Sequence, residues 1–216
     1  MTPFNPLRRR GFLKGLSATT SVALLSGTGL LSGCLGSSTP PPRQFYLSAL
    51  DKPSPGLPEV DWSLVVEPPQ TVPALRTKRI VLAFTPNEFG YYAGVEWGDL
   101  PASMAQGAII RSFRTSGAID VVANERQGIR PDYMLKSWLV PFYAEGEKGA
   151  APLVKIGLDV QLMKMRDRKI VATNAFSHAI QASSPKIEDI VQAFDQAMTN
   201  ILTDVVPWAL LSGEKG

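Results

Sequence analysis

The chain has 216 residues, of which 44% are hydrophobic and 19% charged, so it can bury a core and is not a wholly disordered polymer. A single Cys and a single His exclude an intramolecular disulfide and argue against a structural zinc site. Four of the 22 basic residues lie in the first 33 positions, which hold no acid. The remainder has 18 basic and 19 acidic residues, and so lacks the basic excess of a nucleic-acid-binding protein.

Residues 1–33 have the features of an export signal. A basic cluster at 8–14 precedes an uncharged stretch at 15–42, whose apolar run is often interrupted by Ser, Thr and Gly. This stretch is weakly apolar for a membrane span, although an N-terminal transmembrane anchor is the alternative. The basic cluster resembles the twin-arginine export motif, and the residues that carry the resemblance are Arg9, Arg10, Phe12, Leu13 and Lys14.

The only Cys of the chain ends this stretch. Leu31, Ser32 and Gly33 precede Cys34 and resemble a bacterial lipobox, which predicts that Cys34 is lipidated. A small buried Cys beside an ordinary cleavage site is the alternative. We expect a mature chain from Cys34 with a Pro/Ser-rich tether over 34–44, a folded domain over 45–211 and a tail at 212–216. Leu35 in place of Asp favours sorting to the outer membrane.

The rest of the chain predicts strands, two helices and a loop. Asp99 is expected to cap a helix over about 100–115, which Gly117 ends. A second, amphipathic helix is expected, with Ser184 as its cap, Pro185 at its first position and Pro207 as its stop. Apolar alternation predicts strands at 45–47, 62–66, 79–84, 119–123, 132–143, 153–165 and 169–180. This order predicts an α/β fold, a mixed β-sheet flanked by two helices.

Residues 85–98 are expected to form a loop that is rich in aromatic side chains, namely Phe89, Tyr91, Tyr92 and Trp97. These side chains could simply cover an edge of the sheet. Alternatively, they form a contact surface for a partner, because exposed aromatic rings with polar tips suit protein interfaces. We treat the four residues as candidate partner-binding residues.

The sequence offers no catalytic residues. It has neither the spacing of a phosphate-binding loop nor a nucleophile elbow, and no carboxylate cluster suggests a metal. His178 lies in a predicted strand, where a structural hydrogen bond is the expected role. We therefore expect a protein that is not an enzyme and has no cofactor and no metal.

The order of elements behind this leader resembles the ABC-type transport auxiliary lipoprotein component family, the PqiC-like group, over about 45–208. The motifs that carry the resemblance are Tyr46-Leu47, Ile80-Val81-Leu82 leading to Trp97 and Leu100, Asp132-Tyr133-Met134-Leu135, Phe142, Phe176 and the C-terminal helix. The resemblance implies a fold like the TolB N-terminal domain. It also implies an accessory role in a transport system that moves lipids between the inner and outer membranes.

Its implied partners are a permease, an ATPase and an MCE-domain protein, which this chain would dock to a membrane from the periplasmic side of the cell envelope. A homo-oligomer is compatible with this reading. One alternative is an envelope lipoprotein that assists assembly of an outer-membrane complex. Another is a carrier that itself shields an acyl chain.

Overall fold

The computed structural model describes residues 40–52 and 54–214. Within that range the elements are β1 (Arg43–Phe45), β2 (Leu64–Val66), the short 3-10 helix η1 (Pro73–Leu75), β3 (Arg79–Thr85), β4 (Glu88–Trp97), α1 (Pro101–Ser116), β5 (Val122–Asn124), the 3-10 helix η2 (Glu125–Gln127), β6 (Tyr133–Glu145), β7 (Leu153–Lys164), β8 (Lys169–Gln181) and α2 (Ile187–Glu214). All the strands belong to one sheet.

Three long strands, β6, β7 and β8, form an antiparallel meander on one side of the sheet, where β8 is the edge strand. The other edge of β6 has two partners. β2 pairs in parallel with its first residues, from Tyr133, and β3 pairs in parallel with its last, Ala144 and Glu145. β5 extends the sheet beyond β2, and β4 and then β1 extend it beyond β3. The sheet is therefore wide at both ends of the long strands.

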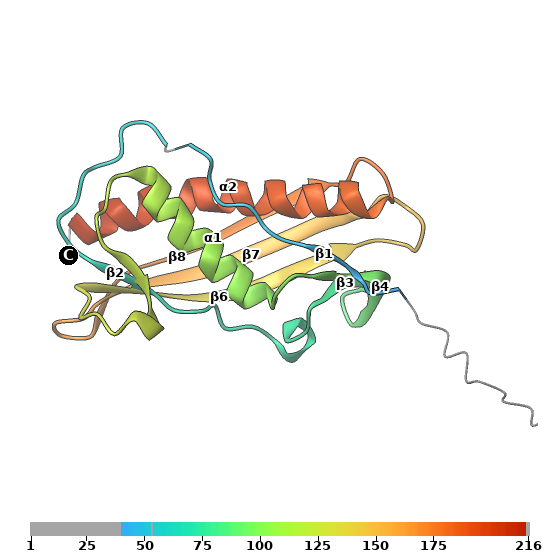
Figure 1. Ribbon diagram of the computed structural model, residues 1–216, viewed down its shortest axis with the longest axis horizontal. Helices are drawn as coiled ribbons and strands as arrows, with labels where there is room; N and C mark the ends of the chain where they lie inside the picture. The colour runs from blue at the N-terminus through green and yellow to red at the C-terminus, as the bar shows by residue number, and fades with distance from the viewer. Residues whose placement is uncertain (1–39, 53, 215–216) are drawn as a thin grey trace, which may run out of the picture. The chain divides into compact units, whose positions relative to one another are not determined.

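Both helices lie over the same face of this sheet, where α1 crosses α2 (Figure 1). The alternation of β7 explains this packing, because every second residue points to the helices. These residues are fully buried: Val154, Ile156, Leu158, Val160 and Leu162. The residues between them, such as Lys155 and Asp159, lie on the opposite face, which neither α-helix covers. The expected mixed sheet with two helices is confirmed.

An aromatic cluster joins the sheet to α2. The ring of Trp97 lies 5.6 Å from that of Phe142 and 5.2 Å from that of Phe194, and the two Phe rings are 5.0 Å apart. All three side chains are almost wholly buried. Since aromatic side chains bury the largest areas and favour tilted or edge-on contacts, this cluster fixes β4 and β6 against the helix.

The prediction of a loop over 85–98 is wrong, because most of this segment forms the strand β4. It forms a hairpin with β3, in which Val81 pairs with Tyr91 and Ala83 with Phe89. Glycines in the segment suggest a loop, but two of them allow local features of the hairpin. Gly94 adopts a positive φ of 71°, and Gly90 leaves room for the ring of Phe84, which would lie 2.7 Å from an added Cβ.

The first helix agrees with expectation except at its start. Its N-cap is Leu100 and no side chain caps it, since the carboxylate of Asp99 accepts a hydrogen bond from the backbone N–H of Leu100 instead. Pro101 occupies the first turn, and Gly117 ends the helix in the left-handed conformation, as predicted.

The second helix begins at Ile187, two residues after the expected first position at Pro185. It does not stop at Pro207 but continues to Glu214, so the expected tail from 212 begins as helix. Pro207 removes one backbone hydrogen bond, at a cost of about 3 kcal/mol in a helix interior. Ala209 and Leu210 beyond it are fully buried. Trp208 packs on Phe176 with ring centroids 5.9 Å apart. This burial offsets the lost bond.

The folded domain begins earlier than the expected residue 45. Arg43 and Gln44 already pair with Val95 and Glu96 as the start of β1. In the described residues, no helix is long and apolar enough to cross a membrane.

Candidate docking surfaces

The four candidate aromatic residues all belong to β4, but the strand sends them to different environments. Phe89 and Tyr91 share one parity and are 42% and 37% exposed. The guanidinium of Arg79 lies 3.9 Å from the centre of the Tyr91 ring, a cation–π contact that holds this ring in place. Phe89 and Tyr91 are therefore available to a partner at the surface.

The other two residues are held by the core. Trp97 is only 1% exposed, and Tyr92 is half-buried against the core. Burial raises the pKa of the Tyr92 hydroxyl to about 12. The expectation that Trp97 contributes to a surface is wrong, because the final residues of β4 run under α2 and meet Phe194.

Phe89 forms one wall of an apolar groove of about 470 Å³ on the sheet face away from the helices. Its ring lies 5.8 Å from that of Tyr143 on β6. The groove is lined by residues 72–75, Val81, Pro86, Phe89 and 140–143. Val72, Phe89 and Val140 are each more than 40% exposed. We call this feature the apolar groove.

An irregularity in β6 shapes the floor of the groove. The register between β6 and β7 shifts between Leu139 and Phe142, so Val140 and Pro141 leave the regular ladder. Gly157 on β7 makes this possible, because a Cβ there would lie 2.5 Å from the carbonyl oxygen of Val140.

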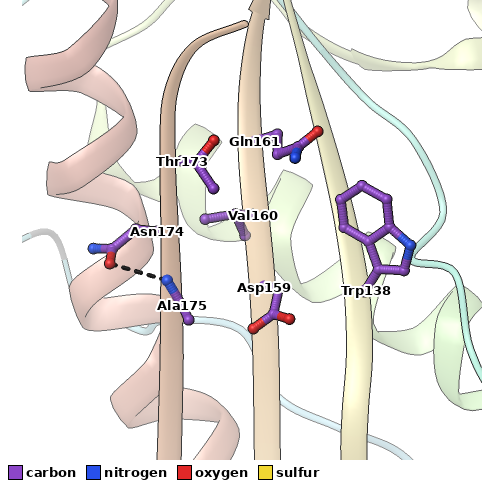
Figure 2. A pocket seen from close by; sticks show the side chains of 7 residues that line it. All are labelled: Trp138, Asp159, Val160, Gln161, Thr173, Asn174 and Ala175. Carbon is purple, nitrogen blue, oxygen red and sulfur yellow. Dashed lines mark hydrogen bonds between the residues drawn. The ribbon is translucent and has the colours of Figure 1, made fainter.

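A second, shallower recess lies further along the same open face, across β6, β7 and β8 (Figure 2). Its lining combines polar side chains, such as Asp159, Gln161 and Thr173, with Trp138, Val160 and Ala175. The indole N–H of Trp138 at its rim donates to the side chain of Gln70 at 3.1 Å.

His178 has the structural role expected of it. It lies on β8, and its Nε2 is 3.0 Å from a carboxylate oxygen of Asp204 on α2. This pair links the sheet to the helix at the surface. Among residues 40–52 and 54–214, no three side chains of the kinds that bind metals lie together.

Comparison with known proteins identifies the chain. The model of the ABC-type transport auxiliary lipoprotein component family matches residues 47–206, which include the whole sheet except β1. The chain belongs to this family. Among curated proteins, none matches it.

Comparison with solved structures gives further similarities. A crystal structure of a Xanthomonas campestris protein of the DUF330 family has a TM-score of 0.74 and 30% identity, covering 80% of this auxiliary lipoprotein and 97% of that chain. A crystal structure of an uncharacterized protein, 13% identical, has a TM-score of 0.59 with 76% and 97% covered, and so shares the fold. The PelC dodecamer from Paraburkholderia phytofirmans is 13% identical, with a TM-score of 0.44 and 74% and 94% covered.

The family match places the apolar groove and β4 within the auxiliary lipoprotein domain itself. The predicted export and lipidation residues lie outside the described residues: Arg9, Arg10, Phe12, Leu13, Lys14, Leu31, Ser32, Gly33 and Cys34. Membership of a lipoprotein family supports a place in the cell envelope.

Sequence reasoning missed half of the groove. Val72 gives no signal in the sequence, because it lies in a Pro-rich stretch without apolar periodicity. Val140 is exposed only because β6 leaves its register at this point, which the Val140-Pro141 pair could have suggested since Pro interrupts a central strand.

Proposed function

We propose that this auxiliary lipoprotein is a non-enzymatic accessory of an ABC-type transport system that moves lipids between the inner and outer membranes. In this proposal Cys34 carries the lipid anchor, after export by the twin-arginine route, and the outer membrane holds it. The domain docks an MCE-domain protein, together with its permease and ATPase, to that membrane. The family match supports the transport role at its general level.

The apolar groove is the observation that carries the docking role. Soluble domains seldom leave several large apolar side chains exposed around one depression, and such patches mark interaction sites. Phe89 can insert into a partner, while the apolar walls accept a partner's side chain in return. Tyr91 beside it adds a ring that Arg79 already orders, so little side-chain entropy is lost on binding.

The anchor would strengthen this contact. Only five residues separate Cys34 from Pro40, the first described residue, and the stretch from Cys34 to Pro40 spans at most about 20 Å. A lipid on Cys34 would therefore keep the domain, and the groove with it, close to the membrane surface. A high local concentration of this kind makes a weak docking contact effective.

The test is co-purification of the tagged full-length protein after gentle detergent extraction, followed by mass spectrometry. We expect the MCE-domain protein, permease and ATPase to be recovered with the wild type. Phe89→Ser should lower their recovery about tenfold, which corresponds to about 1.4 kcal/mol. Ile170→Ser is the matched control, because Ile170 is 43% exposed but lies on β8, far from the groove. It should leave recovery unchanged.

Two further arms test the remaining parts of the proposal. Cys34→Ala should release the protein from membranes, and continued sedimentation with them would contradict the lipid anchor. Recovery of outer-membrane assembly proteins in place of the MCE-domain protein would favour the role in complex assembly. Equal recovery with Phe89→Ser and the wild type would remove the groove from the docking role.

A further inference from the structure

A cluster of cations occupies the end of the sheet opposite to the apolar groove. Four of the six residues over 164–169, at the turn from β7 to β8, are Lys or Arg. Together with Arg130 before β6, they surround a recess of about 790 Å³. Its lining is Arg130, Pro131, Asp132, Lys164, Met165, Arg166 and Arg168. We call it the basic recess.

The acids near this recess do not pair with the exposed arginines. Asp132 accepts hydrogen bonds from the backbone N–H and the hydroxyl of Ser63, at 2.8 and 2.7 Å. Asp167 accepts one from the backbone N–H of Lys169. This end holds two acids and five cations, so its formal charge is +3. The cations are Arg130, Lys164, Arg166, Arg168 and Lys169. The chain from Cys34 onward is formally −1, so the charge is concentrated here.

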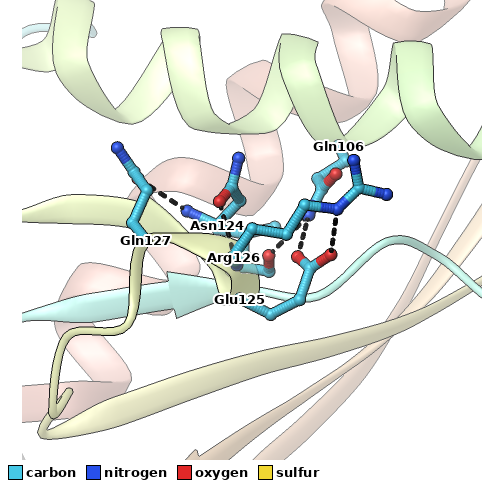
Figure 3. Close-up of polar contacts among 6 residues, drawn as sticks. Gln106, Asn124, Glu125, Arg126 and Gln127 are labelled. Atoms are coloured by element: carbon cyan, nitrogen blue, oxygen red, sulfur yellow. Dashed lines mark hydrogen bonds and ion pairs between the residues drawn. The ribbon is translucent and has the colours of Figure 1, made fainter.

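Several cations elsewhere on the surface form ion pairs. Arg126 on η2 lies 3.6 Å from Glu125, which also accepts a hydrogen bond from Gln106 on α1 (Figure 3). Lys136 and Lys155 lie beside Glu67 and Glu145. Arg130, Arg166 and Arg168 have no ion pair within the described residues. Their guanidinium groups are exposed and available to an external anion.

We propose that the basic recess is a second docking site, which binds an acidic segment of a protein partner. Guanidinium groups form paired hydrogen bonds with carboxylates, and several around one depression can hold successive Asp or Glu side chains. The depression favours a projecting segment over a flat bilayer. Pro131 and Met165 offer apolar contact to the stems of the partner's side chains.

The position of the recess agrees with a protein partner. The pairing of β6 with β7 runs from Tyr143–Lys155 to Tyr133–Lys164, nine residue steps or about 30 Å. The described chain enters at the groove end of these strands, beside β3 and β4 (Figure 1). The basic recess therefore lies about 30 Å along the strands from the end at which the proposed anchor at Cys34 would hold the domain. This placement depends on that anchor, whereas the charge of the recess does not.

The experiment measures binding of a fluorescein-labelled peptide of eight glutamates to the full-length protein in detergent, by fluorescence anisotropy at 50 and 200 mM NaCl. The test variant combines Arg166→Gln with Arg168→Asn. Arg168 has a positive φ of 54°, which Asn tolerates well, so the turn is preserved. Arg126→Gln is the control, because it removes one cation outside the recess.

We expect the double variant to lower peptide affinity at least tenfold and the control to change it less than twofold. Higher salt should weaken binding to the wild type and should affect the double variant less. Equal affinity in the wild type and the double variant would overturn the proposal.

A second arm addresses lipid as the alternative ligand. The protein is placed in phosphatidylcholine vesicles, and separate vesicles with 30% phosphatidylglycerol are added. Clustering of the two populations that depends on Arg166 and Arg168, without peptide binding, would overturn the proposal in favour of a membrane surface. Neither arm contains the transport components, so failure here is distinct from failure of the docking role of Phe89.

Discussion

The two ends of the long strands differ in chemistry and in how they are built. At one end, the apolar groove lies beside a dense aromatic cluster and a close approach between β6 and β7. At the other end, the basic recess is formed by a turn and by residues before β6, which are tied to the rest by polar contacts such as Ser63 with Asp132. Side-chain packing shapes the groove end. Hydrogen bonds and the charges of Arg130, Arg166 and Arg168 shape the basic end.

This difference distinguishes residues that support the surface from residues that contact a partner. At the groove end, the residues that give the surface its shape are buried, and those that meet a partner are exposed side chains above them. Removing a contact there should change binding, while removing a support should change folding. At the basic end both roles belong to exposed residues, so substitutions should have small effects on stability.

Trp97→Ala should have the largest effect. It removes a fully buried ring from the cluster with Phe142 and Phe194, and we expect the free energy of unfolding to fall by about 3–5 kcal/mol. Urea unfolding followed by circular dichroism measures this loss. Tyr91→Ala, on the same strand but at the surface, should cost less than about 1 kcal/mol. A similar loss of unfolding free energy in the two variants would contradict the distinction between supporting and contacting residues.

Gly157→Ala should have an intermediate effect. Its methyl group would meet the carbonyl oxygen of Val140 and the ring of Pro141, so one strand must shift, at about 1–3 kcal/mol. The same shift should disturb the groove floor and reduce co-purification of the partner. Gly107→Ala on α1 is the control. Its methyl group would meet only the flexible end of Arg111, and it should stabilise the helix by about 0.5–1 kcal/mol. Equal stability of the two variants would exclude this account of the floor.

Asp132→Asn should have the smallest effect. The hydrogen bonds from Ser63 lower the pKa of Asp132 below its usual 3.8, so the ionised carboxylate stabilises the folded state above that pH. The stabilisation is lost as the pH falls through the lowered pKa. We expect a loss of about 1 kcal/mol in the variant at pH 7, which shrinks below pH 3.8. Thermal unfolding from pH 2.5 to 7 tests this. A loss that stays constant with pH, or an equal loss in Asp159→Asn on the open face, would contradict the role of Ser63.

The regular elements could be predicted from the sequence, because their periodicity follows from burial on one face. The alternation from Val154 to Leu162 is an example, and so is the repeat along α2. Sequence reasoning failed where tertiary packing overrides local preference. Pro207 remains in a helix because the residues after it are buried, and Gly90 in β4 makes room for the ring of Phe84 on the neighbouring strand.

The candidate site was predicted in part, for the same reason. An aromatic-rich segment identifies Phe89 and Tyr91, but it cannot show that Trp97 points into the core. The opposite wall of the groove depends on a register shift in β6, for which the Val140-Pro141 pair is the only local sign that we identify. The cations of the basic recess come from two segments that meet only in the folded sheet.

The entry of the chain at β1 determines how the domain responds to mechanical tension. β1 pairs in parallel with Val95–Trp97, so a pull on the N-terminus along the strand loads these hydrogen bonds in shear, all at once. The segment is also held to both helices. Arg43 forms an ion pair with Glu188, Ser48 N–H donates to Asp195, and Leu50 N–H donates to Ser112. Tension from an anchored N-terminus would therefore be spread over the sheet and both helices, and would not simply peel β1 from its edge.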